Sequence, residues 1–112
     1  MMPERTIAPV PLGTLYRHGD VLLRVVGHLP SGLWPSSGVI LAHGEVTGHS
    51  HRIEHPETVQ LWEQGSQKFL EVKAPIAHLI HEEHHTIELP RGLYQVWKQR
   101  EYRPEAPIDV AD

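Results

Sequence analysis

Short runs of apolar residues, separated by turn-forming residues, dominate the pattern of this chain. The runs are rich in β-branched residues or alternate apolar with polar positions, and they span residues 21–26, 39–42, 58–63, 68–73, 77–81 and 93–102. Alternation with a period of two over four to eight residues is typical of half-buried strands. The pattern predicts an all-β fold, which would be a small single-domain barrel or sandwich.

Turn signals fall between these runs. His18-Gly19-Asp20, Gln64-Gly65-Ser66-Gln67 and Pro90-Arg91-Gly92 each predict a turn, and residues 27–38 are dense enough in glycine, proline and serine to predict a loop. The one rival to strands lies between Ile76 and His85, where four histidines recur at helical spacing. Pro75 and Pro90 flank that stretch and favour a short strand or turn.

The chain divides into three parts on this pattern. Residues 1–13 contain three prolines and predict an extended N-terminal arm, residues 14–103 form the β domain, and residues 104–112 read as an irregular tail. A length of 112 residues suffices for one hydrophobic core.

Composition narrows the partners and the compartment. The formal net charge is −4 and the ten basic residues are scattered, so we expect no nucleic-acid partner. The chain has no cysteine, which excludes disulfides and thiolate metal sites. No apolar run is long enough for a membrane span, and the first residues lack a signal-peptide pattern, so we expect a cytoplasmic protein without a membrane partner.

Histidine is the unusual residue, with ten copies in the chain. One cluster is Gly48-His49-Ser50-His51, with Glu54 three residues further on. His49 and His51 would share one face of a strand and could converge on one ion. Strict alternation would place Glu54 on the opposite face, so Glu54 could join them only if the strand bends. Surface histidines near a loop are the alternative for this pair taken alone.

The second cluster is His81-Glu82-Glu83-His84-His85. In a strand His81, Glu83 and His85 would share a face, whereas in a turn His81 and His84 would face together; a solvated loop is the alternative. Taken together, the clusters predict a site for a divalent transition metal, with Zn, Ni, Fe, Mn and Cu left open. The expected ligands are His49, His51, one or both of His81 and His84, and Glu54 or a water.

Three acidic residues, Asp20, Glu45 and Glu83, are candidates for a supporting role around such a site, where they would orient imidazoles or move protons. The isolated histidines are not expected to be ligands: we expect His18, His28 and His55 to be solvated in loops, and His43 and His78, which flank apolar strands, to be core or interface residues.

Two resemblances follow from these motifs. His49-Ser50-His51, the carboxylate after it and Pro90-Arg91-Gly92 resemble the motifs of a cupin, which implies a jelly-roll barrel with a metal held by histidines and a glutamate. The chain departs from that pattern at Gln95, where a cupin has histidine. The chain also resembles a family of small uncharacterised bacterial proteins in segments that include residues 16–22, 44–51 and 89–94.

Three functions remain open at this stage. The first is a metal-binding β module, self-associating into a homo-oligomer, whose site would be closed or shared between subunits. The second is a cupin-type metal-dependent enzyme, an oxygenase, isomerase or hydrolase acting on a small molecule, which would keep an open coordination position in a pocket. The third is a metal-free protein with a pH-sensitive histidine surface.

Overall fold

The computed structural model describes residues 10–44 and 46–99, and the statements below concern these residues. They form eight strands and one turn of 3-10 helix. Glu45, most of the predicted arm and the predicted tail lie outside the described residues. The elements are β1 (Leu15–His18), β2 (Val21–Val26), β3 (Trp34–Ser36), β4 (Ile40–His43), β5 (Ser50–Ile53), η1 (Pro56–Thr58), β6 (Val59–Gln64), β7 (Gln67–Ile80) and β8 (Ile87–Lys98).

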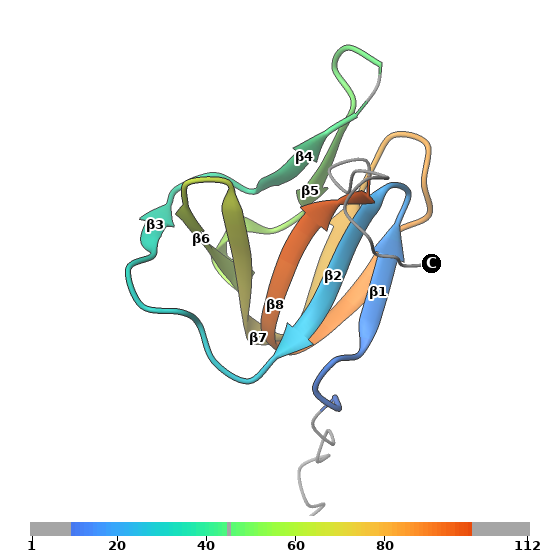
Figure 1. The fold of residues 1–112 in the computed structure, drawn as a ribbon. Coiled ribbons are helices and arrows are strands. Elements are labelled where there is room, and N and C mark those ends of the chain that lie inside the picture. Colours follow the sequence, from blue (N-terminus) through green and yellow to red (C-terminus); the bar gives the residue numbers. More distant parts are fainter. Residues whose placement is uncertain (1–9, 45, 100–112) are drawn as a thin grey trace, which may run out of the picture.

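The strands form one antiparallel sheet that curls on itself (Figure 1). Its main path runs β1-β2-β8-β7-β5-β4, and β6, which pairs with β3, joins the other part of β7. This confirms the expected all-β class, with a half-barrel as its form. No helix that could cross a lipid bilayer occurs in the part of the chain that the structure describes.

Two long strands give the sheet its curl. β7 and β8 pair along nearly their whole length, but the register shifts between Val72 and Ile76. The first half of β7 pairs with β6, whereas its last two residues pair with β5. A bulge of this kind bends a strand and increases its local twist. The two halves of β7 therefore carry different neighbours on the same edge, and the sheet wraps around one interior.

That interior is apolar and continuous. Leu23, Leu70, Leu79 and Leu89 are fully buried, and Tyr94 is almost so. Tyr94 reaches the carbonyl oxygen of Pro90 with its hydroxyl group, which satisfies its buried polar atom. Buried positions alternate with half-buried ones along the first four residues of β6, as the sequence pattern predicts, whereas the first three residues of β2 are all buried.

Most of the histidines lie in, or in the strands next to, loops that gather at one end of this half-barrel. In Figure 1 the β1–β2 turn, the β4–β5 loop, the β7–β8 loop and the end of β8 lie together at that end. Lys98, the last residue of β8, donates to the carbonyl oxygen of His43 at the end of β4. The curl of the sheet thus brings together segments that are up to 82 residues apart in sequence.

Two local predictions were wrong. Pro90-Arg91-Gly92 is not a turn but lies within β8, and the expected strand 93–102 is the second half of that strand, described as far as Lys98. Proline is tolerated there because β2 pairs with β8 only from Leu93 onward and the bulge of β7 lies opposite. The predicted loop 27–38 contains the short strand β3, which pairs with β6. The histidine stretch after β7 is a loop, not a helix.

Candidate metal centre

Four imidazoles meet at the open end of the half-barrel. His18 closes β1, His51 lies in β5, and His81 and His84 lie in the β7–β8 loop. The ring centroids of His51 and His81 are 4.4 Å apart, those of His81 and His84 are 4.6 Å apart, and those of His51 and His84 are 5.5 Å apart. One nitrogen from each of His51, His81 and His84 lies within 4.8 Å of the other two.

Strand pairing explains why these rings meet. Arg52 lies opposite Ile80 where β5 pairs with β7, so His51 and His81 occupy adjacent positions at the end of that ladder. The loop after Ile80 then turns, which places His84 on the same side as His81. Of the two arrangements that the sequence allowed for this cluster, the structure has the turn.

Glu82 fastens that loop to β5. Its carboxylate accepts a hydrogen bond of 3.1 Å from the backbone N–H of Ser50 and one of 2.9 Å from Arg52. The hydrogen bond from Ser50 is the largest contribution that lowers the pKa of Glu82, and Arg52 adds to it. The histidine loop is therefore held against the strand that carries His51.

Two glycines leave room for the rings. Gly19 has a φ of +64°, and a Cβ there would lie 2.7 Å from Nε2 of His84 and 3.0 Å from Cε1 of His51. A Cβ at Gly44 would lie 3.0 Å from Cβ of His49 and 3.1 Å from Nε2 of His81. Side chains at these two positions would push into the histidine cluster, so glycine is required by close approach.

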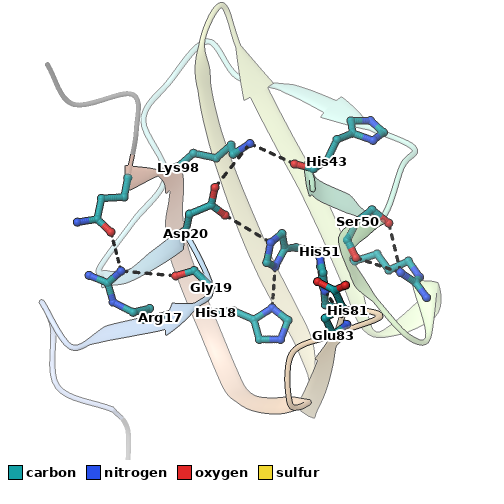
Figure 2. A network of polar contacts seen from close by, with 12 residues as sticks. Arg17, His18, Gly19, Asp20, His43, Ser50, His51, His81, Glu83 and Lys98 are labelled. Carbon is teal, nitrogen blue, oxygen red and sulfur yellow. Dashed lines mark hydrogen bonds and ion pairs between the residues drawn. The ribbon is translucent and has the colours of Figure 1, made fainter. Parts of the chain in front are cut away.

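His51 is the centre of a line of polar contacts (Figure 2). Its Nδ1 lies 2.9 Å from Nδ1 of His18, and its Nε2 lies 3.5 Å from Oδ1 of Asp20. The other nitrogen of His18 lies 2.8 Å from the carbonyl oxygen of His85. His18 and His51 are each only 2% exposed. These two imidazoles are thus inside the protein. Both nitrogens of His18 and Nδ1 of His51 have a close polar partner, whereas Nε2 of His51 faces the carboxylate of Asp20 at a longer distance.

Burial favours the neutral form of three of these rings, His18, His51 and His81. The pKa of His51 is lowered to about 4, first by removal from water and then by the neighbouring His81 and His18, against the opposing effect of Asp20. Desolvation also lowers the pKa of His18 and of His81, with the other histidines as additional causes. Neutral imidazoles are the form that binds a metal ion, so burial favours the metal-binding form of these three rings.

A cavity of about 420 Å³ adjoins the cluster. Its walls include His49, His51, His81, His84, Asp20 and Glu83. Imidazole rings and carboxylates line this cavity together with Val46 and two glycines, so polar and apolar surface contribute about equally. Its size suits a small molecule.

A comparison with known proteins identifies one matching family. Residues 17–99 match the family described as a domain of unknown function (DUF8820). The chain belongs to this family. Neither the curated proteins nor the solved structures contain a match. The matched segment begins one residue before His18 and ends one residue after Lys98, so the family domain includes the whole histidine cluster.

The structure brings most of the sequence-predicted site residues together. His49, His51, His81 and His84 all line the cavity, as do Asp20 and Glu83. Oε2 of Glu83 lies 3.8 Å from Nδ1 of His49, which is the range of an ion pair and too long for a hydrogen bond. Glu45 lies outside the described residues.

Glu54 is placed elsewhere. It follows the end of β5, its carboxylate lies 3.7 Å from Nε2 of His55, and it is not part of the cavity wall. The chain bends at Glu54 directly after β5, and the bend leaves the Glu54 carboxylate beside His55 and outside the cavity that His51 lines. Gln95, where a cupin has histidine, lies in β8 opposite Arg24 and Phe69.

A second group of possible ligands is chemically weaker. His49, His81 and Glu82 also offer atoms within 4.8 Å of one another. However, both oxygens of Glu82 already accept hydrogen bonds, from Ser50 and Arg52. An ion bound there would have to displace both contacts. In the group of His51, His81 and His84 an ion would disturb a single one, the hydrogen bond of 2.9 Å that Nδ1 of His81 accepts from the backbone N–H of Glu83.

Sequence reasoning missed two residues of the centre. His18 was expected to be solvated, yet it is buried against His51, and Glu82 was not singled out within its run of charged residues. His18 precedes a glycine and an aspartate in a tight turn, and that motif was the available signal. Nothing in the sequence could show that the turn faces β5, because that contact depends on the curl of the sheet.

Proposed function

We propose that this domain binds a divalent transition-metal ion through His51, His81 and His84. The observation that carries the proposal is the convergence of three imidazole nitrogens within 4.8 Å of one another, one of them from a fully buried ring. Ligands of a tetrahedral zinc ion are separated by about 3.4 Å. Small rotations of the two loop histidines span the difference.

The donor set favours a borderline metal over a hard one. Three neutral imidazoles suit Zn²⁺, Cu²⁺, Ni²⁺, Co²⁺ and Fe²⁺, whereas Mg²⁺ and Ca²⁺ prefer oxygen ligands. All three ligands come from one chain, so the site needs no partner subunit. Bound metal would join β5 to the β7–β8 loop and thereby stabilise the open end of the half-barrel.

Metal analysis with a matched pair of variants tests the proposal. Untagged protein is expected to retain about one equivalent of metal, or to take up Zn²⁺ or Ni²⁺ after chelation, and to gain thermal stability on loading. His84→Ala should abolish this gain. His85→Ala, which changes the neighbouring side chain in the same loop but keeps its carbonyl group, should not. Protein that neither contains metal nor is stabilised by added Zn²⁺ or Ni²⁺ would contradict the proposal.

A second candidate function is a metal-dependent enzyme acting on a small molecule. The cavity beside the ligands favours it, as does the cupin-like motif of His49 and His51. A bound ion would supply Lewis acidity or activate water there. Glu83 lies in the cavity wall and could accept a proton from a reacting group.

Access to the ion separates the two candidates. Protein loaded with Co²⁺ has a visible spectrum that responds to its ligands, so azide or thiocyanate should change that spectrum if a coordination position is open. An unchanged spectrum would favour the purely stabilising site. Self-association stays a separate proposal, and light scattering with and without metal measures it.

A further inference from the structure

The hydrogen bond of His18 to the backbone fixes the proton on one of its nitrogens. Nε2 of His18 lies 2.8 Å from the carbonyl oxygen of His85. A carbonyl oxygen only accepts hydrogen bonds, so Nε2 of His18 must carry the hydrogen. In a neutral imidazole the other nitrogen, Nδ1, then has a free lone pair and accepts.

The same reasoning determines which nitrogen of His51 carries its hydrogen. Nδ1 of His51 lies 2.9 Å from Nδ1 of His18, which is an acceptor, so Nδ1 of His51 must donate. A neutral His51 therefore has no hydrogen on Nε2. Burial of both rings opposes an additional proton on either of them, because a charged imidazole loses its hydration there. The two hydrogen bonds, from His18 to the carbonyl oxygen of His85 and from His51 to His18, thus leave the Nε2 lone pair of His51 free.

That lone pair faces a carboxylate. Nε2 of His51 lies 3.5 Å from Oδ1 of Asp20 (Figure 2). Two acceptors at this distance repel each other unless a proton or a cation lies between them. Their separation is close to the roughly 3.4 Å between two ligands of one tetrahedral ion. Asp20 also lines the same cavity as His81 and His84.

Extending the proposed function, on which this inference rests, we propose that Asp20 is the fourth ligand of the metal ion and that His18 is a positioning residue. His18 orients Nε2 of His51 toward the ion by accepting from its Nδ1. The carboxylate of the site is then Asp20 from the β1–β2 turn, in place of the Glu54 that the sequence suggested.

The surroundings of Asp20 suit this role. Gly19, with its φ of +64°, turns the chain directly before Asp20 and leaves room for the rings of His84 and His51. Lys98 lies 3.8 Å from Oδ2, the other oxygen of Asp20. With Asp20 included, zinc would have four protein ligands once the β1–β2 turn closes on the ion, because the carboxylate of Asp20 does not lie within 4.8 Å of all three imidazole nitrogens. A six-coordinate ion would keep two positions for water or substrate.

Metal titration of one charge-removing variant and its control tests the ligand. Asp20→Asn keeps the shape of the side chain and should weaken Zn²⁺ or Ni²⁺ binding by about 10- to 100-fold, the effect typical of a lost supporting or ligating group. Glu54→Gln makes the same chemical change at the other candidate carboxylate and should leave affinity unchanged. Unchanged affinity in Asp20→Asn, or an equal loss in Glu54→Gln, would overturn the assignment.

Nitrogen NMR of the metal-free protein tests the positioning residue. ¹⁵N shifts of the imidazoles should show His51 protonated at Nδ1 in the wild type. His18→Leu removes the acceptor, so the tautomer of His51 should become mixed and metal affinity should fall by about 10- to 100-fold. His18→Asn restores an acceptor oxygen and should recover both the tautomer and part of the affinity. A purely structural His18 would alter stability without altering the tautomer.

The outcomes separate this inference from the function it extends. Wild-type protein that binds metal while Asp20→Asn binds equally well refutes Asp20 as a ligand and leaves the histidine site intact. Wild-type protein that binds no metal refutes the site itself. A wild-type His51 protonated at Nε2, which NMR reads without any metal, refutes the role of His18 in either case.

Discussion

The middle of the half-barrel and its open end bury their side chains equally well but with opposite chemistry. Leu70 and Leu79 in β7 are completely buried, and His18 and His51 at the open end are 2% exposed. Burying a leucine gains roughly 1.5–3 kcal/mol from the hydrophobic effect. Burying an imidazole removes water from a polar ring, and only hydrogen bonds compensate for the loss.

The comparison indicates which region serves stability and which serves function. An apolar set at the open end would complete the core at lower cost. Four histidines lie there instead, with ring centroids 4.4–6.3 Å apart, and Asp20 lies 3.5 Å from His51. Groups that do not improve packing, and whose pKa values are shifted by burial and by each other, tend to gather at functional sites. The largest differences between the two regions should therefore appear when each is mutated separately.

Truncation in the middle of the sheet should have the largest effect on stability. Leu70→Ala leaves a cavity in the core and should lower the free energy of unfolding by about 2–5 kcal/mol. The metal affinity of the molecules that remain folded should not change. His81→Ala should do the reverse, with binding lost and the metal-free stability little altered. Denaturant unfolding and metal titration of both variants measure these effects. If Leu70→Ala lost metal binding under conditions where it is fully folded, the division between a stabilising middle and a metal-binding open end would be wrong.

Acid should destabilise the open end before the middle. The pKa of His51 in the folded protein is about 4, below its usual 6.5. Between these values the unfolded chain binds a proton that the folded chain excludes, so stability is complete above pH 6.5 and falls as the pH approaches 4. His51 alone accounts for a loss of up to about 3 kcal/mol. The lowered pKa values of His18 and His81 act in the same direction.

Urea unfolding of metal-free protein at pH 7.5 and pH 4.5 measures this loss. His51→Leu should show a shallower dependence on pH, whereas Leu70→Ala should be less stable at both values with the slope of the wild type. Equal slopes in the wild type and His51→Leu would show that the unfolded state and the folded state hold the His51 proton alike, contrary to its burial.

The middle of the fold could be predicted from the sequence, because strand patterns are local. The alternation over residues 58–63 and 68–73 around Gly65 gave β6 and the first half of β7. The continuation of β7 past Pro75 and of β8 past Pro90 could not be predicted. Judged from the local sequence alone, each proline ends a strand. The bulge of β7 and the absence of β2 beside Pro90 are what allow prolines at these two positions.

The histidine end was predictable in its residue types but not in its geometry. Two clusters of histidine indicated a metal site, and four of the expected ligands line one cavity. The partners from the β1–β2 turn could not be assigned, since His18 and Asp20 reach His51 only through the curl of the sheet. Glu54 looked favourable because it is close to His51 in sequence, but its carboxylate lies beside His55 and not in the cavity.

Glycine replacement should separate backbone strain from crowding of the rings. Gly19→Ala and Gly65→Ala each place a side chain at positive φ, +64° and +59°, and should each cost about 1–2 kcal/mol of stability. Only at Gly19 would the new Cβ meet His84, at 2.7 Å from its Nε2, whereas Gly65 has open space. We expect weaker metal binding in Gly19→Ala alone. Equal affinity in both variants would mean that the ring of His84 moves freely and is not held for the ion.

The ion pair that anchors the histidine loop should have the smallest effect. Arg52→Met removes the contact of 2.9 Å to Glu82 but leaves the hydrogen bond from the backbone of Ser50 in place. Because the pair is partly exposed, we expect metal affinity to fall by no more than about fivefold. The difference from the wild type should shrink as NaCl is raised, since salt screens the pair that the variant lacks.

Glu88→Gln, which removes the more exposed carboxylate beside His78, serves as the control and should bind metal like the wild type. A loss in Arg52→Met as large as that expected for Asp20→Asn would mean that loop anchoring, more than the ligand set itself, determines how tightly the open end holds its ion.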